Sequence, residues 1–247
     1  MLSTPEAWHA LVVNFMKVLA RNQLVWLDAQ AWAQMQAHPW DDEAQHILAH
    51  WRSTSLPLVL CRQRVEVAPD QICLGLPAPQ HWSRRRLALT ARLDQVLAFG
   101  VFPTLFQVAR ACHWGQAALD LDLALSNWGV TAHVYGSHGW QLLTNMPYLH
   151  DGSDLDLSLA VPDFQTACRV QALMAEVELE RRLDGEIVFP GGQAVAWREL
   201  QRLVTGQTSQ VLLKDRQNIR LASLAEVQKL GACGVPHEVS ETALALP

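Results

Sequence analysis

The sequence predicts an α+β fold, and its apolar content, its mixture of periodicities and one proline-containing break support that prediction. Half of the 247 residues are hydrophobic, which is enough for a substantial core. Segments with helical apolar spacing occur together with short strand-like runs. Pro77 and Pro79 lie among loop-like residues, so we place a small N-terminal α+β domain at residues 1–80 and a second domain at residues 81–247.

The N-terminal part is expected to begin with a helix and to continue into a small sheet. We predict an amphipathic helix at residues 6–20, a strand at 24–27 and helices within 29–52. Strand-like runs follow at 57–62, 64–67 and 71–76.

The second part is expected to place several helices against a small sheet. Helices are predicted at residues 84–99, 103–112, 115–128 and 162–182, with a short one through Trp140. Strands are predicted at 131–135, around Asp156, at 186–189 and 193–197, and as a pair at 211–214 and 219–221. The pair Asp184-Gly185 predicts a tight turn before the strand at 186–189.

Charge, hydropathy and cysteine usage exclude several classes of protein. The formal net charge of −5 argues against a general nucleic-acid binder, which is usually basic. No run reaches the roughly 18 consecutive apolar residues that cross a membrane. Residues 1–20 lack the basic start and the small-residue cleavage site of a signal peptide. The five scattered cysteines indicate reduced thiols rather than a zinc site. We therefore expect a cytoplasmic protein that binds neither nucleic acid nor membrane.

The most informative segment spans residues 134–159. The pair Gly136-Ser137 follows a short apolar strand, and a second apolar strand then carries Asp154 and Asp156. Residues two apart in a strand point to the same face, so the two carboxylates project together. They repel each other unless a cation lies between them, and Mg²⁺ prefers oxygen ligands and binds substrate phosphates. Because glycine lets backbone N–H groups approach a phosphate, the segment predicts a phosphoryl- or nucleotidyl-transfer site.

This arrangement resembles the DNA polymerase β-like nucleotidyltransferase superfamily, in which Gly-Ser precedes an Asp-x-Asp strand. The residues in between, Trp140-Gln141 and Leu143-Thr144 among them, resemble the phosphoribosyl-dephospho-CoA transferases that mature the acyl-carrier subunit of malonate decarboxylase. Further stretches that resemble this family are residues 21–27, 74–77, 84–86, 184–190 and 196–199. The resemblance covers most of the chain, and it implies a nucleotidyltransferase-like mixed sheet flanked by helices.

The resemblance also implies a reaction and a set of site residues. The 2′-(5″-phosphoribosyl)-3′-dephospho-CoA group would pass from its triphosphate precursor to a serine of the apo acyl carrier protein of malonate decarboxylase, with release of diphosphate. Asp154 and Asp156 would hold Mg²⁺, and one of them would accept the serine proton. The superfamily normally adds a third carboxylate from a neighbouring strand, for which we choose Glu186. Gly136 and Ser137 would hold the terminal phosphates.

Several of these residues have alternative interpretations. Asp184 is the second candidate for the third carboxylate. Ser137 is also a candidate for an ordinary N-cap, and both readings are compatible because a helix N-terminus attracts anions. Lys214 follows an apolar strand, so it either reaches a substrate phosphate or is simply solvated. Trp140 is most simply a core anchor, and Tyr148 either stacks on the adenine or packs in the core.

The basic residues leave a choice between a solvated surface and an anion-binding patch. The main basic region is formed by residues 84–86, with Arg62, Arg64 and Arg92 nearby in the sequence. It would suit the triphosphate, coenzyme A or an acidic carrier protein, so we expect the N-terminal domain to hold the donor or the carrier.

Two other functions are compatible with the motifs. One is an adenylyltransferase that acts on another protein or a small molecule, against which the Trp-Gln-x-Leu-Thr segment argues. The other is a catalytically inactive module that only binds the carrier protein, against which the intact Asp154 and Asp156 argue.

Overall fold

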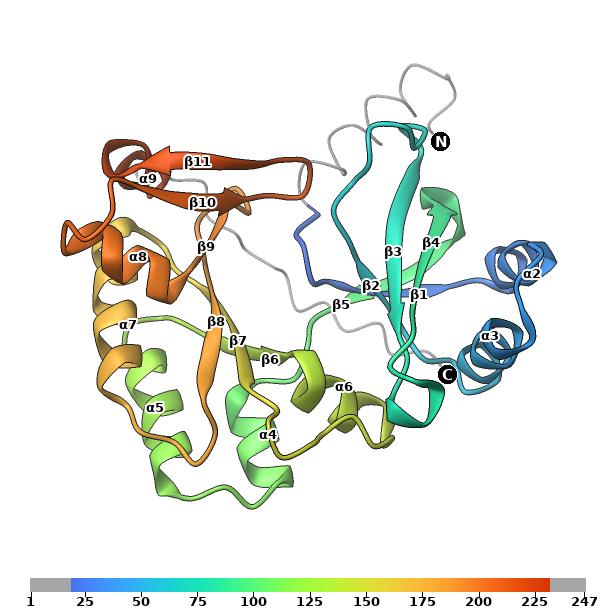
Figure 1. The fold of residues 1–247 in the computed structure, drawn as a ribbon, viewed down its shortest axis with the longest axis horizontal. Coiled ribbons are helices and arrows are strands. Elements are labelled where there is room, and N and C mark those ends of the chain that lie inside the picture. The colour runs from blue at the N-terminus through green and yellow to red at the C-terminus, as the bar shows by residue number, and fades with distance from the viewer. Residues whose placement is uncertain (1–18, 232–247) are drawn as a thin grey trace, which may run out of the picture.

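The computed structural model describes residues 19–231, which form two separate sheets with helices packed on their outer sides (Figure 1). This mixture of helices with antiparallel and mixed sheets confirms the predicted α+β class. The helix expected at residues 6–20 lies outside the described residues except for residues 19 and 20, which are not helical.

The first sheet contains five strands in the order β4-β3-β2-β1-β5, each antiparallel to its neighbours. Its strands are β1 (Leu24–Leu27), β2 (Leu58–Leu60), β3 (Gln71–Pro77), β4 (Arg86–Arg92) and β5 (Val96–Gly100). The strands predicted at 24–27, 57–62 and 71–76 are confirmed. Residues 64–67 belong to the connection between β2 and β3, so the strand predicted there is wrong.

The helix predicted at residues 84–99 is also wrong, because this segment forms β4, a short 3₁₀ turn at Leu93–Gln95 and β5. Along β4, exposed and buried residues alternate strictly, with Leu87, Leu89 and Ala91 on the buried side. This period of two is typical of a strand, whereas the helix prediction relied on apolar residues at helical spacing in the same segment. The first sheet therefore continues to Gly100, beyond the boundary placed at residue 80.

Two helices, α2 (Ala29–Ala37) and α3 (Asp42–Ser53), cover the outer face of the first sheet, as predicted within residues 29–52 (Figure 1). Asp28 and Asp41 cap them by accepting backbone N–H groups at 2.7 and 2.9 Å. Their apolar sides pack around Trp51 against the strands. The opposite face of the sheet is left to face the second sheet.

The second sheet contains six strands in the order β11-β10-β9-β8-β7-β6. Only the pair β7–β8 is parallel within the described residues. The strands are β6 (Ala132–Tyr135), β7 (Leu155–Ala160), β8 (Leu183–Val188), β9 (Ala194–Ala196), β10 (Gln210–Lys214) and β11 (Ile219–Ser223). The predicted strands at 131–135, 211–214 and 219–221 and the strand around Asp156 are confirmed.

The turn predicted at Asp184-Gly185 is replaced by the middle of β8. Gly185 has φ +146° and pairs with Leu157 of β7. A Cβ atom at Gly185 would overlap the Leu157 backbone, so the glycine permits a close approach of two strands rather than a reversal of the chain. As a result, Asp184 and Glu186 both belong to β8 and project to one face of the sheet.

The helices of the second half are α4 (Leu105–Ala111), α5 (Gln116–Ser126), α6 (Gly136–Thr144), α7 (Phe164–Glu176), α8 (Trp197–Val204) and α9 (Leu224–Leu230). The first three match the expected positions, while α7 ends six residues before residue 182, where its helix was expected to end. α8 and α9 were not expected. The strand predicted at 193–197 stops at Ala196, because Trp197, Leu200 and Leu203 form the buried side of α8.

Apolar packing, hydrogen bonds and an ion pair join the two halves. A small core between them contains Leu24, Phe102, Trp140 and Tyr148. The Tyr148 hydroxyl donates to the Pro77 carbonyl at 2.7 Å, and the Gln63 N–H donates to the Arg216 carbonyl at 2.7 Å. Arg21, which precedes β1, forms an ion pair with Glu186 of β8 at 3.5 Å. The uncovered faces of the two sheets are thereby held opposite each other (Figure 1).

Candidate active site

The centre of the candidate site is formed by three adjacent strands of the second sheet. In their register, Asp156 of β7 lies between Tyr135 of β6 and Asp184 of β8. Leu155 and Leu157 are buried on the other face, so the alternation of β7 directs Asp156 away from the main core. The predicted division between acidic and apolar faces is therefore confirmed for Asp156, whereas Asp154 lies before the strand.

Asp156 is the most perturbed carboxyl group of this strand. Burial, followed by the charges of Asp184 and Asp154, raises the pKa of Asp156 to about 6. Asp156 forms no hydrogen bond or ion pair with any residue in the described part of the chain. Burial also raises the pKa of the neighbouring Tyr135, which is therefore a neutral phenol at physiological pH.

The Gly136-Ser137 pair begins helix α6 directly beside Asp156. Gly136 has φ +62°, and a Cβ atom there would overlap the Asp156 carboxylate. The helix is N-capped by Tyr135 without a side-chain hydrogen bond, so the interpretation of Ser137 as the N-cap is wrong. The free N–H groups of this first turn make it a suitable place for an anion.

Asp154 lies just before β7 and is held by Arg182. The Arg182 guanidinium donates to both carboxylate oxygens, at 2.9 and 2.5 Å. This bidentate pair keeps the pKa of Asp154 below its usual value. Asp154 and Asp156 thus lie close together in the chain but differ in protonation behaviour, since one has a cationic partner and the other has none.

Glu186, the chosen third carboxylate, is buried and bound to two cations. Lys214 of β10 donates to it at 2.8 Å, and Arg21 lies at 3.5 Å. Lys214 is therefore neither simply solvated nor free for a phosphate. Among residues 19–231, Asp184, the second candidate, accepts only its neighbour's backbone N–H at 2.8 Å, and it pairs directly with Asp156 across the two strands.

A metal ion would need a change in these ion pairs. Within residues 19–231, no three acidic, histidine or cysteine side chains already form a metal-binding group. Asp154 is directed to Arg182, and Glu186 is directed to Lys214. The remaining pair, Asp156 and Asp184, provides oxygen ligands and uncompensated negative charge, which fit a hard cation such as Mg²⁺.

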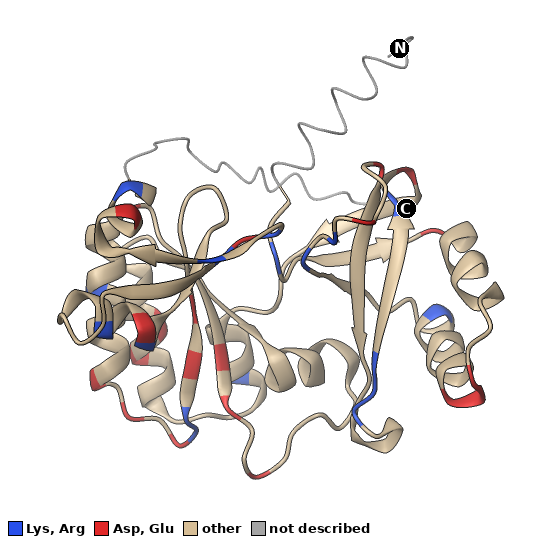
Figure 2. Ribbon diagram, turned by 45° about the horizontal axis from the view of Figure 1, so that its top comes forward, with Lys and Arg blue, Asp and Glu red and all other residues tan. Residues whose placement is uncertain are grey.

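The site opens into a cleft of about 800 Å³ between the two sheets. Its second-sheet wall includes Tyr135, Gly136, Ser137 and Asp156. Its first-sheet wall combines apolar residues with four arginines: Arg62, Arg64, Arg84 and Arg86. Figure 2 shows the same division, with acidic positions on β7 and β8 and basic positions on the first sheet. Sequence reasoning did not foresee that these two sets face one cleft.

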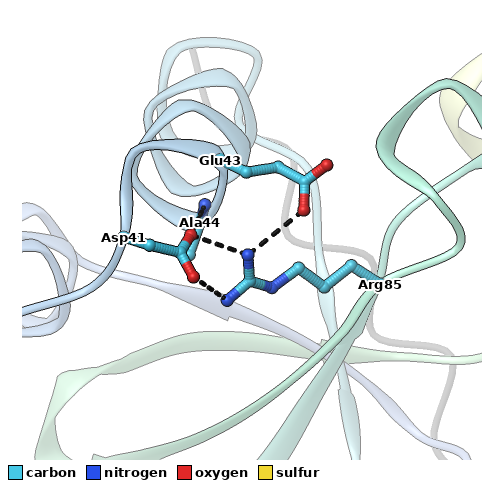
Figure 3. Close-up of polar contacts among 4 residues, drawn as sticks. All are labelled: Asp41, Glu43, Ala44 and Arg85. Atoms are coloured by element: carbon cyan, nitrogen blue, oxygen red, sulfur yellow. Dashed lines mark hydrogen bonds and ion pairs between the residues drawn. The ribbon is translucent and has the colours of Figure 1, made fainter.

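Arg85 has a different role from its two neighbours in the sequence. Its guanidinium binds both oxygens of Asp41 at 2.6 Å and reaches Glu43 at 3.1 Å (Figure 3). These contacts lower the pKa of Asp41 to about 2. Because Asp41 also accepts the Ala44 N–H, Arg85 fastens the start of α3 to the turn before β4. The basic run thus divides into a structural arginine and two cleft arginines.

Two aromatic residues near the site pack in the core. Trp140 forms an edge contact with Phe102 and stacks on Tyr148, with ring centroids 5.4 and 6.3 Å apart. Both are buried, and the Tyr148 hydroxyl is used by the Pro77 carbonyl. These contacts favour the core-packing interpretation for both residues over stacking on a bound adenine.

Sequence reasoning missed two partners in the site, Arg182 and Arg21, and it named Asp184 only as the second candidate for the third carboxylate. Arg182 and Arg21 come from connections, where no local pattern marks them as partners of Asp154 and Glu186. Asp184 was read as a turn residue, because a strand glycine and a turn glycine look alike in sequence.

Within the described ranges, no helix has both the length and the apolar character needed to cross a membrane.

Comparisons with known proteins agree with the segments that carry the resemblance. The family described as "Phosphoribosyl-dephospho-CoA transferase MdcG C-terminal domain" matches residues 87–225, and the corresponding N-terminal domain matches residues 20–102. A phosphoribosyl-dephospho-CoA transferase of Xanthomonas axonopodis pv. citri is 36% identical over 205 residues, covering 81% of this chain and 92% of that protein. One from Bradyrhizobium diazoefficiens is 33% identical over 206 residues, covering 81% and 88%. No solved structure matches significantly. The chain therefore belongs to the phosphoribosyl-dephospho-CoA transferase family of enzymes.

Proposed function

We propose that this protein transfers the 2′-(5″-phosphoribosyl)-3′-dephospho-CoA group from its triphosphate precursor to a serine of the apo acyl carrier protein of malonate decarboxylase. The serine oxygen forms a bond to the phosphorus nearest the ribose. The bond from that phosphorus to the next phosphate breaks, and diphosphate leaves with the electron pair. The product is a phosphodiester-linked prosthetic group.

One observation supports this proposal most strongly: Asp156, a carboxylate without a partner, lies against Gly136 at the start of α6 inside a cleft lined by arginines. The helix terminus suits the phosphates, and the carboxylate suits the incoming hydroxyl. The family membership supplies the identity of the transferred group.

The triphosphate would be positioned by the first turn of α6. Its backbone N–H groups have no side-chain cap, and the Ser137 hydroxyl lines the same cleft. Gly136 provides the positive φ that begins the helix and leaves room for the Asp156 carboxylate. Phosphate oxygens would therefore lie close to the carboxyl group that receives the proton.

The serine proton would pass to the pair formed by Asp156 and Asp184. Burial and nearby acidic charge raise the pKa of metal-free Asp156 to about 6, which suits a group that takes up a proton. Tyr135, which is neutral, borders this pair on the other side. The proton would then pass from Asp156 to solvent through the cleft that this residue lines.

Mg²⁺ is the proposed cofactor, held by Asp154, Asp156 and a third acid of β8. Bound there, it would neutralise the charge that develops on the leaving diphosphate. Asp154 would have to exchange Arg182 for the metal. Glu186 would have to release Lys214, whereas Asp184 would release only a backbone N–H, so this structure favours Asp184 as the third ligand.

Intact mass spectrometry of the apo carrier protein tests the proposal. The carrier is incubated with this protein, Mg²⁺ and the triphosphoribosyl donor, with parallel reactions that contain EDTA, ATP alone or the Asp156→Asn variant. We expect a mass gain of one phosphoribosyl-dephospho-CoA group only in the complete reaction. A gain of AMP from ATP would establish the adenylyltransferase alternative instead. If a folded protein that binds the carrier yields no gain, the inactive binding module becomes the correct description.

A further inference from the structure

One wall of the cleft is basic and belongs entirely to the first sheet and its connections. Two of its arginines come from the connection between β2 and β3, and two from the start of β4 and the residues before it. Figure 2 shows basic positions there, opposite the acidic strands β7 and β8. We call these residues the cleft arginines: Arg62, Arg64, Arg84 and Arg86.

The cleft arginines have no carboxylate partner among the described residues, unlike several arginines elsewhere in the protein. Five arginines that do not line the cleft form ion pairs with acids within residues 19–231: Arg21, Arg85, Arg92, Arg182 and Arg220. None of the cleft arginines has an ion-pair partner between residues 19 and 231, and all four are exposed. An exposed guanidinium without a partner keeps its full set of N–H donors for a phosphate.

The backbone that carries these side chains is held in place. Between Arg62 and Arg64, Gln63 donates its N–H to the Arg216 carbonyl and its side-chain amide to the Gln71 carbonyl at 2.9 Å. Its side-chain oxygen accepts the Cys73 N–H at 3.3 Å.

The second pair of arginines follows an unusual turn. Ser83 and Arg84 are consecutive residues with φ +54° and +53°, a conformation that costs free energy for residues other than glycine. The Arg84 N–H is bound to the Pro79 carbonyl at 3.2 Å. Both pairs of arginines are therefore presented by anchored segments rather than by free loops.

The two walls offer anion-binding features that face each other across one cleft. The first turn of α6 and the Asp156–Asp184 pair suit the reacting phosphates, and the cleft arginines suit a second anionic group. Our inference rests on the proposed function, whose donor has two such groups joined through an adenosine. One is the triphosphate on the added ribose, and the other is the diphosphate that links adenosine to the pantetheine arm.

We propose that the cleft arginines bind the diphosphate of the dephospho-CoA part of the donor. Their position inside the cleft that contains Asp156, rather than on an outer surface, favours the donor over the carrier protein as their ligand. ATP has a triphosphate but no second diphosphate. The first sheet therefore determines specificity by selecting the coenzyme A derivative over ATP.

Isothermal titration with dephospho-CoA, without any metal, tests this assignment independently of the transfer reaction. The variants are Arg62→Gln with Arg64→Gln, and Arg84→Gln with Arg86→Gln. The matched control is Arg92→Gln, on the same strand and the same face as Arg86 but outside the cleft, where it pairs with Asp94. We expect each double variant to weaken dephospho-CoA binding by about tenfold or more, as for lost charge-assisted bonds to phosphate.

Transfer kinetics provide the second readout. If the arginines hold the donor, KM for the donor rises in the double variants while kcat and the affinity for the carrier protein stay close to those of the parent. Folding of each variant is checked by circular dichroism and thermal melting. Dephospho-CoA binding that is unchanged in folded double variants would overturn the inference, and so would a loss confined to carrier affinity.

The same experiment separates this inference from the proposed function. Loss of dephospho-CoA binding in the arginine variants, together with no transfer to the carrier by the parent protein, would support the arginine site and reject the proposed reaction. Normal transfer by variants that bind dephospho-CoA as tightly as the parent would support the reaction and reject the arginine site.

Discussion

The two walls of the cleft differ in how their charges are compensated. On the second sheet, Asp154 and Glu186 are neutralised by cations, and Asp156 is left without a partner. On the first sheet, the cleft arginines have no partner within the described residues, although Arg85 beside them is fully paired. A folded protein usually pairs such groups or leaves them in open solvent. Asp156 is only partly exposed and the cleft arginines are exposed, so unpaired charge of opposite sign lines the two facing walls of one cleft.

The largest effect should come from Asp156→Asn. The amide cannot accept the serine proton, so we expect single-turnover transfer to fall by about 10²–10⁴-fold, the usual contribution of a general base. Asparagine removes the repulsion from Asp184, so the variant should be at least as stable as the parent. Intact mass of the carrier protein measures the rate, and thermal melting measures the stability. A variant with parental turnover would remove Asp156 from the mechanism.

Gly136→Ala should come next, because it affects the backbone and the carboxylate together. The residue needs φ +62°, and its Cβ would overlap Asp156, so we expect a loss of about 1–3 kcal/mol in the free energy of unfolding and a large loss of activity. Gly129→Ala is the matched control, since Gly129 has φ +70° and no atom within 4 Å of a built Cβ. If both variants lose equal activity, Gly136 serves the backbone alone.

Glu186→Gln and Asp184→Asn separate the two candidates for the third carboxylate. Glu186→Gln leaves Lys214 and Arg21 without their partner, so denaturant unfolding should show a loss of about 1–3 kcal/mol, moderated by the partial exposure of both cations. Asp184→Asn should leave stability unchanged or higher, because it removes a charge that raises the pKa of Asp156. The Mg²⁺ concentration required for transfer should then increase more in Asp184→Asn. A larger increase in Glu186→Gln would restore our first choice.

The pH dependence of stability should carry a smaller signature of Asp156. Its pKa is about 6 in the folded state and near 3.8 when unfolded, so the folded state binds more protons between these values. Stability from this group is therefore highest at low pH and falls as pH rises from about 4 to 6, by roughly 1–2 kcal/mol once the full shift is reduced for the partial exposure of Asp156. The difference in unfolding free energy between the parent and Asp156→Asn is measured at pH 4 and at pH 7. The change in this difference between the two pH values gives the contribution of Asp156 to stability. A difference that does not change with pH would show that Asp156 titrates normally.

The two walls of the cleft, one from each sheet, were not equally predictable from the sequence. Gly136, Ser137, Asp154 and Asp156 were predicted because their chemistry depends on local spacing, namely a glycine turn and the alternation of one strand. Asp184 was misread because whether Gly185 bends the chain or admits a neighbouring strand depends on β7, which the local sequence does not contain.

The wall formed by the first sheet could not be predicted from local sequence, because its formation depends on long-range strand pairing. Residues 84–99 contain apolar residues that satisfy a helical period, and only pairing with β3 makes the period of two at Leu87, Leu89 and Ala91 decisive. Once β4 is a strand, Arg86 reaches the cleft. A basic run in the sequence thus acquires a function only after the sheet is known.

The smallest effect should come from Arg85→Gln, which tests whether neighbours in that run differ as the structure indicates. Arg85 contacts Asp41 and Glu43 at the start of α3 and does not line the cleft, so dephospho-CoA affinity should remain parental. The pKa of Asp41 should rise toward its usual value, because the hydrogen bonds from the Arg85 guanidinium, which lower it most, are lost. Titration by NMR reports the pKa, and calorimetry reports the affinity. Arg84 and Arg85 are adjacent in sequence and carry the same charge, but only Arg84 lines the cleft. Weaker dephospho-CoA binding in Arg84→Gln alone would therefore show that the position of the guanidinium in the cleft, rather than net positive charge, determines the affinity. Equal losses in both variants would instead indicate a general electrostatic attraction.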